Sequence, residues 1–286
     1  MRHVLSNLLF GSLFLTALVA GTSGCKEVNP LGTAAPVDTA TSVQQKNILI
    51  EDITGVRCPN CPEGHEKAQQ LQDANPGRVE VVAIHNGDLS SPFAFSAYDF
   101  RIPQGAQIDN FLGPADYWPK GSIDRKEYGN TGETGILMGR NYWIGNGDQR
   151  LTDTLRVDVG LSKSYNAATR KFDLDVTLHY LADVADAQKI TVYLTESGLM
   201  DAQEFPDHID TFYVHDNVLR TVLTDVQGDP ITETTASGTD VQRSYSFTLP
   251  AAWNPQNCRA IVFVSRNTSD PSVGKEVLQV SGINVQ

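Results

Sequence analysis

A short cysteine motif between a predicted strand and a predicted helix restricts the fold more than any other feature of the sequence. The motif is Cys58-Pro59-Asn60-Cys61. Residues 47–53 and 79–84 have the apolar pattern of buried strands. Between them a helix should begin just after the motif, where Pro62 suits the first helical position, and should end near Asn75-Pro76-Gly77. A strand, a helix and a second strand of these lengths predict a right-handed βαβ unit.

The position of the motif at a helix N-terminus has a chemical consequence. The helix dipole and the free backbone amides stabilise a thiolate there, which lowers the pKa of the thiol. Cys58 would then be the attacking thiol of a redox pair, and Cys61 the resolving thiol. The alternative is a permanent Cys58–Cys61 disulfide that staples the turn in an oxidising compartment. A zinc site would need two further ligands, and His65 is the one candidate ligand close to the motif. We therefore expect no metal ion or other cofactor.

A proline stands where a third strand of this region should begin. The segment Tyr117-Trp118-Pro119 precedes a short predicted strand. In thioredoxin-like folds a cis-proline at this place lies opposite the C-x-x-C motif and holds an extended substrate, and Pro119 resembles that residue. Residues 47–150 are therefore predicted to form an α/β thioredoxin-like domain. Residues 88–110 are predicted to be an insertion of loops and a short helix, whose aromatic side chains either line a groove beside the cysteines or pack in the core.

From residue 151 onward the apolar pattern changes to a period of two. Residues 172–180 alternate apolar and polar side chains, as half-buried strands do. Several such segments follow one another without long helices, which predicts an all-β antiparallel sandwich domain over residues 151–286. Its own apolar faces predict that it folds without the first domain. Residues 199–217 interrupt the rhythm with acidic and histidine side chains, and we predict a solvated loop there, with a cation site as the alternative.

The N-terminus has the pattern of an exported lipoprotein. A basic residue precedes an apolar stretch over residues 4–20, and a run of small residues ends at Cys25. This pattern predicts a signal peptide over residues 1–25 with Cys25 as the lipid anchor. Thr22 departs from the usual aliphatic residue, so cleavage without lipidation is one alternative, and an uncleaved membrane helix, for which the stretch is short, is another. Residues 26–46 lack periodicity and are predicted to be a flexible linker.

The formal net charge of −12 restricts the partners of the protein. Neutralising phosphates requires an excess of Lys and Arg, so no nucleic-acid partner is expected. An acidic surface also keeps a protein away from anionic headgroups, apart from a covalent anchor in the membrane. Cys258 is the remaining thiol once Cys25 and the C-x-x-C pair are assigned, and we predict that it is buried as a small apolar residue.

Several motifs together resemble those of one family. In chain order they are Cys25, the run from Gly55 to Pro62, Tyr117-Trp118-Pro119, the run from Tyr213 to Arg220, and Asn257-Cys258-Arg259. Over nearly the whole mature chain the sequence resembles the Omp-twenty-eight-related outer-membrane lipoproteins of Bacteroidetes-type bacteria. The resemblance implies a location at the cell outer membrane, a thioredoxin-like domain joined to a β-rich domain, and a surface adhesin or receptor whose partners are envelope or surface proteins. Working thioredoxins have Trp before the first cysteine and Gly-Pro between the pair, so their redox potential and partners do not transfer to this chain.

Two functions from different classes follow from these observations. One is thiol-disulfide exchange on envelope proteins, with Cys58 as the more accessible, attacking thiol, Cys61 as the resolving thiol and Pro119 as a clamp on the substrate backbone. The other is binding at the cell surface, with a structural C-x-x-C disulfide. An exposed Cys58 sulfur and a free groove beside Pro119 would favour exchange. A cover over the sulfur, formed by the insertion or by the sandwich, would favour binding.

Overall fold

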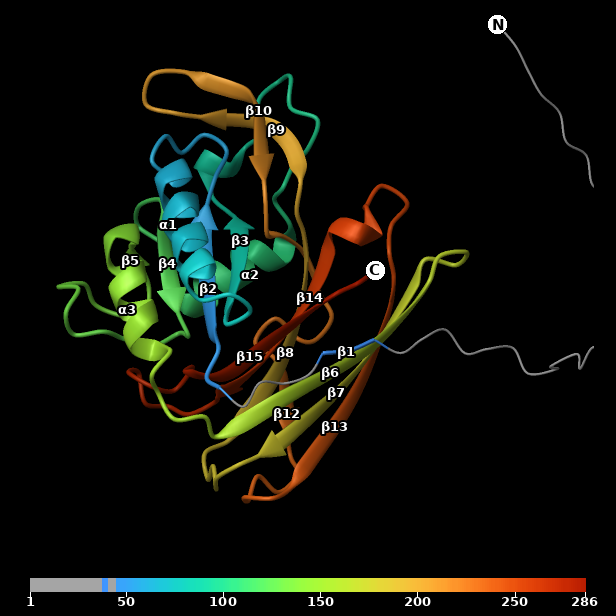
Figure 1. Ribbon diagram of the computed structural model, residues 1–286. Helices are drawn as coiled ribbons and strands as arrows, with labels where there is room; N and C mark the ends of the chain where they lie inside the picture. Colours follow the sequence, from blue (N-terminus) through green and yellow to red (C-terminus); the bar gives the residue numbers. More distant parts are fainter. Residues whose placement is uncertain (1–37, 41–44) are drawn as a thin grey trace, which may run out of the picture. The chain divides into compact units, whose positions relative to one another are not determined.

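A computed structural model describes residues 38–40 and 45–286 of the chain (Figure 1). The predicted signal peptide and the predicted lipid anchor Cys25 lie outside these residues. The described part is mostly β, with one large mixed sheet and two antiparallel sheets. Within residues 38–40 and 45–286, no helix has the length and the apolar character that crossing a membrane requires.

The first half of the described chain mixes strands and helices, whereas the second half consists almost entirely of strands. The elements of the first half are β1 (Asp38–Ala40), β2 (Ile48–Thr54), α1 (Cys61–Ala74), β3 (Val79–His85), η1 (Asp88–Ser90), α2 (Pro103–Leu112), β4 (Lys120–Ile123), β5 (Met138–Gly139), η2 (Arg140–Tyr142) and α3 (Trp143–Arg150). Those of the second half are β6 (Val157–Asn166), β7 (Lys171–Tyr180), β8 (Gln188–Glu196), β9 (Leu199–Glu204), β10 (Ile209–His215), β11 (Val218–Val222), β12 (Asp229–Ile231), β13 (Asp240–Thr248), η3 (Pro255–Asn257), β14 (Cys258–Arg266) and β15 (Val277–Asn284).

The βαβ unit predicted around the cysteine motif is present. β2 and β3 are parallel along their full length, and α1 connects them. The helix has a proline in its first turn and ends at Asn75, whose backbone N–H donates to carbonyls of the last turn. β4 begins directly after Pro119 and pairs antiparallel with β2, so the proline is held at the end of a strand next to the one that leads into the motif.

Both faces of this part of the sheet are covered. Successive side chains of a strand point to opposite faces, so β2 contributes to two cores. Ile48 and Ile50 pack with α1 and α3 on one face. Leu49 and Ile53 pack on the other face against apolar residues of α2, β8, β14 and β15.

A third core lies between two sheets of strands. The sheet β1-β6-β7-β13 packs against β8, β14 and β15 through alternating residues such as Phe172, Leu174 and Val176. Two facing layers of antiparallel strands are therefore present in this region, but the layer of β8, β14 and β15 is part of the large mixed sheet. β8 and β14 are buried on both faces, because their other side packs against β2 and β3.

The structure corrects the predicted division of the chain near residue 150. The described residues belong to one compact unit. β11 pairs with β8 and, at Val218 opposite Ala83, with β3, so one nine-stranded sheet contains strands from both regions. A hydrogen bond from a buried ion pair also joins the two regions. Arg125 binds Glu51 of β2 at 2.7 Å within the first region and donates to the hydroxyl of Tyr193 in β8, in the second, at 2.9 Å.

Part of the segment predicted to be a flexible linker, residues 26–46, is structured. Asp38–Ala40 forms β1, which pairs antiparallel with β6. The ammonium group of Lys46 is buried against the carboxylate of Asp124, which also accepts a hydrogen bond from Arg150 at 2.8 Å. The linker prediction is therefore wrong at these positions, because a buried ammonium needs fixed partners to offset the loss of its hydration.

Candidate functional site

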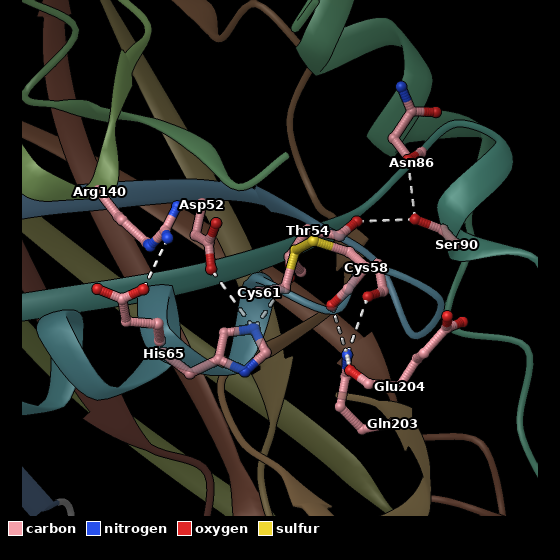
Figure 2. Close-up of a disulfide and its surroundings, with 12 residues drawn as sticks. Asp52, Thr54, Cys58, Cys61, His65, Asn86, Ser90, Arg140, Gln203 and Glu204 are labelled. Carbon is pink, nitrogen blue, oxygen red and sulfur yellow. Dashed lines mark hydrogen bonds and ion pairs between the residues drawn. A yellow bond between two sulfur atoms is a disulfide. The ribbon is translucent and has the colours of Figure 1, made fainter. Parts of the chain in front are cut away.

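Cys58 and Cys61 form a disulfide at the junction between β2 and α1, as the sequence indicates (Figure 2). Cys58 lies in the turn after β2, and Cys61 is the first residue of the helix. The backbone N–H of Cys61 donates to the carbonyl of Cys58 at 3.1 Å and closes the turn. Gly55 allows this turn to pass close to a neighbouring loop, because a Cβ at that position would lie 2.5 Å from the carbonyl oxygen of Leu89.

Pro119 lies beside the helix that follows the disulfide. The peptide bond between Trp118 and Pro119 is cis, as predicted. The ring of Pro119 is buried against Gly64, where a Cβ would come within 2.9 Å of the proline Cγ. The structure thus brings Pro119 next to the first turn of α1. Its role as a clamp on a substrate backbone stays a prediction.

A hairpin covers the disulfide. Cys58 is 1% exposed and Cys61 is 0% exposed. The side-chain amide of Gln203 in β9 donates to the carbonyl of Cys58 at 3.0 Å and lies 3.4 Å from the carbonyl of Gly55 (Figure 2). The next residue, Glu204, donates its backbone N–H to the carbonyl of Val56 at 2.8 Å. The prediction that Cys58 is accessible is therefore wrong for this disulfide form.

The covering hairpin consists of β9 and β10, within the segment for which the sequence predicts a solvated loop. The two strands are antiparallel, and Figure 1 shows them beyond the first turn of α1. Asp201 of β9 accepts a hydrogen bond from the backbone N–H of Tyr98 at 2.7 Å. Phe93 and Phe100 of the 88–110 insertion pack with Leu199 of the hairpin. Core packing is therefore the role of these two aromatic residues.

Arg57, directly before Cys58, contacts the 88–110 insertion. Its guanidinium donates to the carbonyls of Ser91 at 2.8 Å and Pro92 at 2.9 Å, and it lies 4.1 Å from the ring centroid of Phe93. The side chain therefore ties the disulfide turn to the insertion.

A row of polar side chains runs beside the disulfide, and the sequence patterns gave no role to its most buried member, Asp52. Asp52 of β2 is 1% exposed, and its Oδ2 lies 3.6 Å from Nε2 of His65 in α1 (Figure 2). The other ring nitrogen of His65 is hydrogen-bonded to the hydroxyl of Tyr213 in β10 at 2.8 Å. Burial raises the pKa of Asp52 to about 8 and lowers that of His65 to about 3. An aspartate within the apolar run Ile48–Ile53 was the available signal for this row.

A groove opens at the end of this row, between α1, β3 and β10. Its volume is about 380 Å³, and Asp52, His65 and Tyr213 are part of its wall. Val81 and Ala83 of β3 form another part of the wall. The groove is partly open to solvent, and its volume suits a small group or a short extended segment.

Cys258 is a free thiol and is buried, as predicted. Burial is the first cause that raises its pKa to about 12. Across the residues that the structure describes, no group of three or more His, Cys, Asp and Glu side chains is arranged to hold a metal ion. A cation site was the alternative prediction for the acidic and histidine side chains of residues 199–217. These side chains lie along the β9–β10 hairpin, where the ring of His215 is buried and its Nε2 lies 3.3 Å from the carbonyl oxygen of Ala202.

The fold and the site define a β-rich protein with a C-x-x-C disulfide at the start of a helix. The chain belongs to the family of outer membrane protein Omp28, whose model matches residues 114–286. Membership associates the protein with the cell envelope. The matched range includes Pro119 and the covering hairpin but begins after the disulfide. A search of curated proteins finds no significant match.

Solved structures support the fold. HBP35 of Porphyromonas gingivalis is 19% identical with a TM-score of 0.68, over 86% of this chain and 77% of the other. A protein of Agrobacterium tumefaciens is 12% identical with a TM-score of 0.50, over 86% of this chain and 96% of the other. A domain of the outer membrane lipoprotein Omp28 from Porphyromonas gingivalis is 15% identical over 47% of this chain and 91% of the other, with a TM-score of 0.31, which is too low for a comparison of folds.

Proposed function

We propose that this outer-membrane protein is a binding protein of the cell envelope in which the Cys58–Cys61 disulfide is structural. The observation that carries the proposal is the cover over Cys58, which leaves 1% of the residue exposed. Exchange begins when a thiolate attacks a sulfur along an open path. With Gln203 and Glu204 bonded to the disulfide turn, a partner cysteine has no such path.

The covering hairpin also supplies a surface for binding. Its outward side chains are large and apolar, which is unusual for a solvated strand, and Phe212 is 74% exposed. Exposed apolar patches on soluble proteins mark sites of interaction. The other exposed apolar side chains on the hairpin are those of Met200, Ile209 and Val214. In this proposal the partners are envelope or surface proteins, and a lipid on Cys25 holds the chain at the membrane.

A redox titration tests the structural role of the disulfide. In glutathione buffers of defined potential, the native protein should have a reduction potential below about −300 mV, the range of structural disulfides in secreted proteins. It should not accelerate the reduction of insulin by dithiothreitol. The Cys58→Ser/Cys61→Ser double variant should stay folded and lose about 2 kcal/mol of unfolding free energy, because the closed loop is short. A potential in the range of exchange catalysts, together with insulin reduction, would refute the proposal.

Thiol-disulfide exchange is the second candidate, and the placement of two residues favours it. Pro119 lies in cis against the first turns of α1, and the carboxyl of Asp52 has an unpartnered oxygen among the described residues. In an α/β thioredoxin-like arrangement these positions serve exchange at a helix N-terminus. Here the hairpin would first have to move away from Cys58, so this function requires an opening step.

A further inference from the structure

The wall of the groove between α1, β3 and β10 includes an unpaired part of a strand edge. Alternate residues of a strand direct their backbone N–H and C=O groups to the same edge. Ala83 donates to the carbonyl of Asn217 on the edge away from β2, and the Val79 carbonyl accepts from the side chain of Gln72 at 3.1 Å. Val81 lies between them on that edge. Within residues 38–40 and 45–286, β11 pairs with β3 only at Ala83, so the N–H and C=O of Val81 have no strand partner.

The charge of the groove has one sign. Among the described residues that line it are four acidic side chains, three of them exposed, and no Lys or Arg. Glu66 and Asp73 are exposed on α1, and Asp216 is exposed after β10. Such a wall attracts cationic groups and repels anionic ones.

Within this acidic groove, the carboxyl of Asp52 is the group with which a cationic side chain would pair. Its side chain is part of the groove wall and is 1% exposed. Its Oδ1 has no hydrogen-bond partner among the described residues. A buried carboxyl oxygen without a donor is costly, and a donor from a ligand would remove that cost.

The remaining wall is apolar. Ala68 of α1 and Val214 of β10 line the groove beside Val81. Small and branched apolar side chains beside a strand edge suit the side chains of an extended peptide.

From these features we propose that the groove binds an extended polypeptide segment with a lysine or arginine side chain, which pairs with the free edge of β3 at Val81. The segment's cationic side chain points to Asp52, and its neighbouring apolar side chains contact Ala68 and Val214. Strand addition of this kind takes its affinity from backbone hydrogen bonds and its selectivity from side-chain pockets. The inference rests on the proposed binding function and names the chemistry of the partner.

A peptide titration tests the inference on the protein with its Cys58–Cys61 disulfide formed. The probe is a fluorescein-labelled, acetylated and amidated pentapeptide with a central lysine between two valines, and fluorescence anisotropy at low ionic strength gives its Kd. The same peptide with a central glutamate should not bind. N-methylation of the backbone nitrogens that face β3 should weaken binding about tenfold, because two backbone hydrogen bonds are lost.

Variants of the protein locate the site. Glu66→Lys/Asp73→Lys reverses the charge of two exposed positions in the groove and should weaken binding of the lysine peptide about tenfold. The matched control, Asp88→Lys/Asp148→Lys, changes the charge by the same amount at exposed positions outside the groove and should leave the Kd within about twofold. Asp52→Asn should also weaken binding about tenfold, because an amide cannot ionise to pair with the bound cationic side chain as the carboxyl can.

The inference is overturned by absence of binding, by equal binding of the lysine and glutamate peptides, or by a Kd that the groove variants leave unchanged. Unchanged affinity of the N-methylated peptide would show that a cation binds without strand pairing, which also overturns it. These outcomes leave the redox titration untouched. A failed peptide titration with a low reduction potential would therefore refute this partner and retain the structural disulfide.

Discussion

Two neighbouring acidic residues of β2 are buried in opposite ways. Glu51 points into the core shared with β8, where Arg125 binds it through two hydrogen bonds of 2.7 and 2.8 Å and the hydroxyl of Tyr193 lies at 3.1 Å. Asp52 points to the other face, where no cation is paired with it among the described residues and burial raises its pKa to about 8. A buried charge is tolerated when it is paired, and otherwise the group becomes neutral. The alternation of a strand thus separates a structural ion pair from a carboxyl that is open to a ligand.

Asp52 should make stability depend on pH in a predictable direction. Its pKa is raised from 3.8 to about 8 in the folded state, so between these values the folded state holds a proton that the unfolded state releases. Raising the pH through this window therefore costs stability, by at most about 1.4 kcal/mol per pH unit. The Asp52→Asn variant lacks this term. Its unfolding free energy, measured in urea, should rise relative to wild type from about pH 4 to about pH 8 and then stay constant.

The exposed Asp148 of α3 provides the control for this measurement. Asp148→Asn makes the same chemical change at an exposed position and serves as the reference for the effect of removing a carboxyl from the surface. If the curves of Asp52→Asn and wild type ran parallel, the carboxyl of Asp52 would be ionised in the folded protein at neutral pH.

At the scale of elements, the β9–β10 hairpin shows why sequence patterns found some strands and missed others. In β7 the buried side chains are apolar and the exposed ones polar, so alternation predicts the strand. In β9 the polarity is inverted, because Asp201 and Gln203 are buried while Met200 is 54% exposed. The buried polar groups bond to loops that are distant in sequence, and no local pattern encodes such partners.

The helix and the disulfide could be predicted because their signals are local. The proline in the first turn of α1, the carboxylate of Glu63 and the stop at Asn75 all lie within the element they define. The cover over Cys58 was not predictable, because the covering residue Gln203 is 145 positions away in the sequence.

The hairpin should control how fast the native disulfide is reduced. Gln203→Ala removes the hydrogen bonds to the carbonyls of Cys58 and Gly55, so the hairpin should open more often. We expect reduction by tris(carboxyethyl)phosphine to become about tenfold faster, as measured by quenched alkylation and mass spectrometry. Thr211→Ala, an exposed change on the same hairpin, should not alter the rate. The comparison is made under conditions where the three proteins unfold globally at the same rate. Equal reduction rates in all three would mean that the reductant reaches the sulfurs without opening of the hairpin.

At the scale of the whole molecule, the strands of the sandwich and those of the βαβ unit depend on one another. β8 and β14 are buried on both faces, which requires a layer on each side. The continuous apolar run from Ala260 to Val264 was the sequence signal for this, since a half-buried strand alternates. Nothing in that run tells which elements form the second layer, because tertiary contacts decide it.

The fragment 151–286 should therefore fail to fold by itself, contrary to the expectation from its alternating strands. Without β2 and β3, the apolar side chains of Tyr193, Phe263 and Val280 would face water. The carboxylate of Glu80, which binds Arg259 at 2.6 Å, would also be lost. The fragment should bind a hydrophobic dye and unfold in urea without a cooperative transition, whereas residues 35–286 should show a single one. Adding fragment 35–150 should restore cooperativity, because it supplies the missing layer. A steep unfolding transition of 151–286 alone would show that the sandwich core suffices for this fragment to fold. The core shared with β2 and β3 would then only hold together two parts that fold independently.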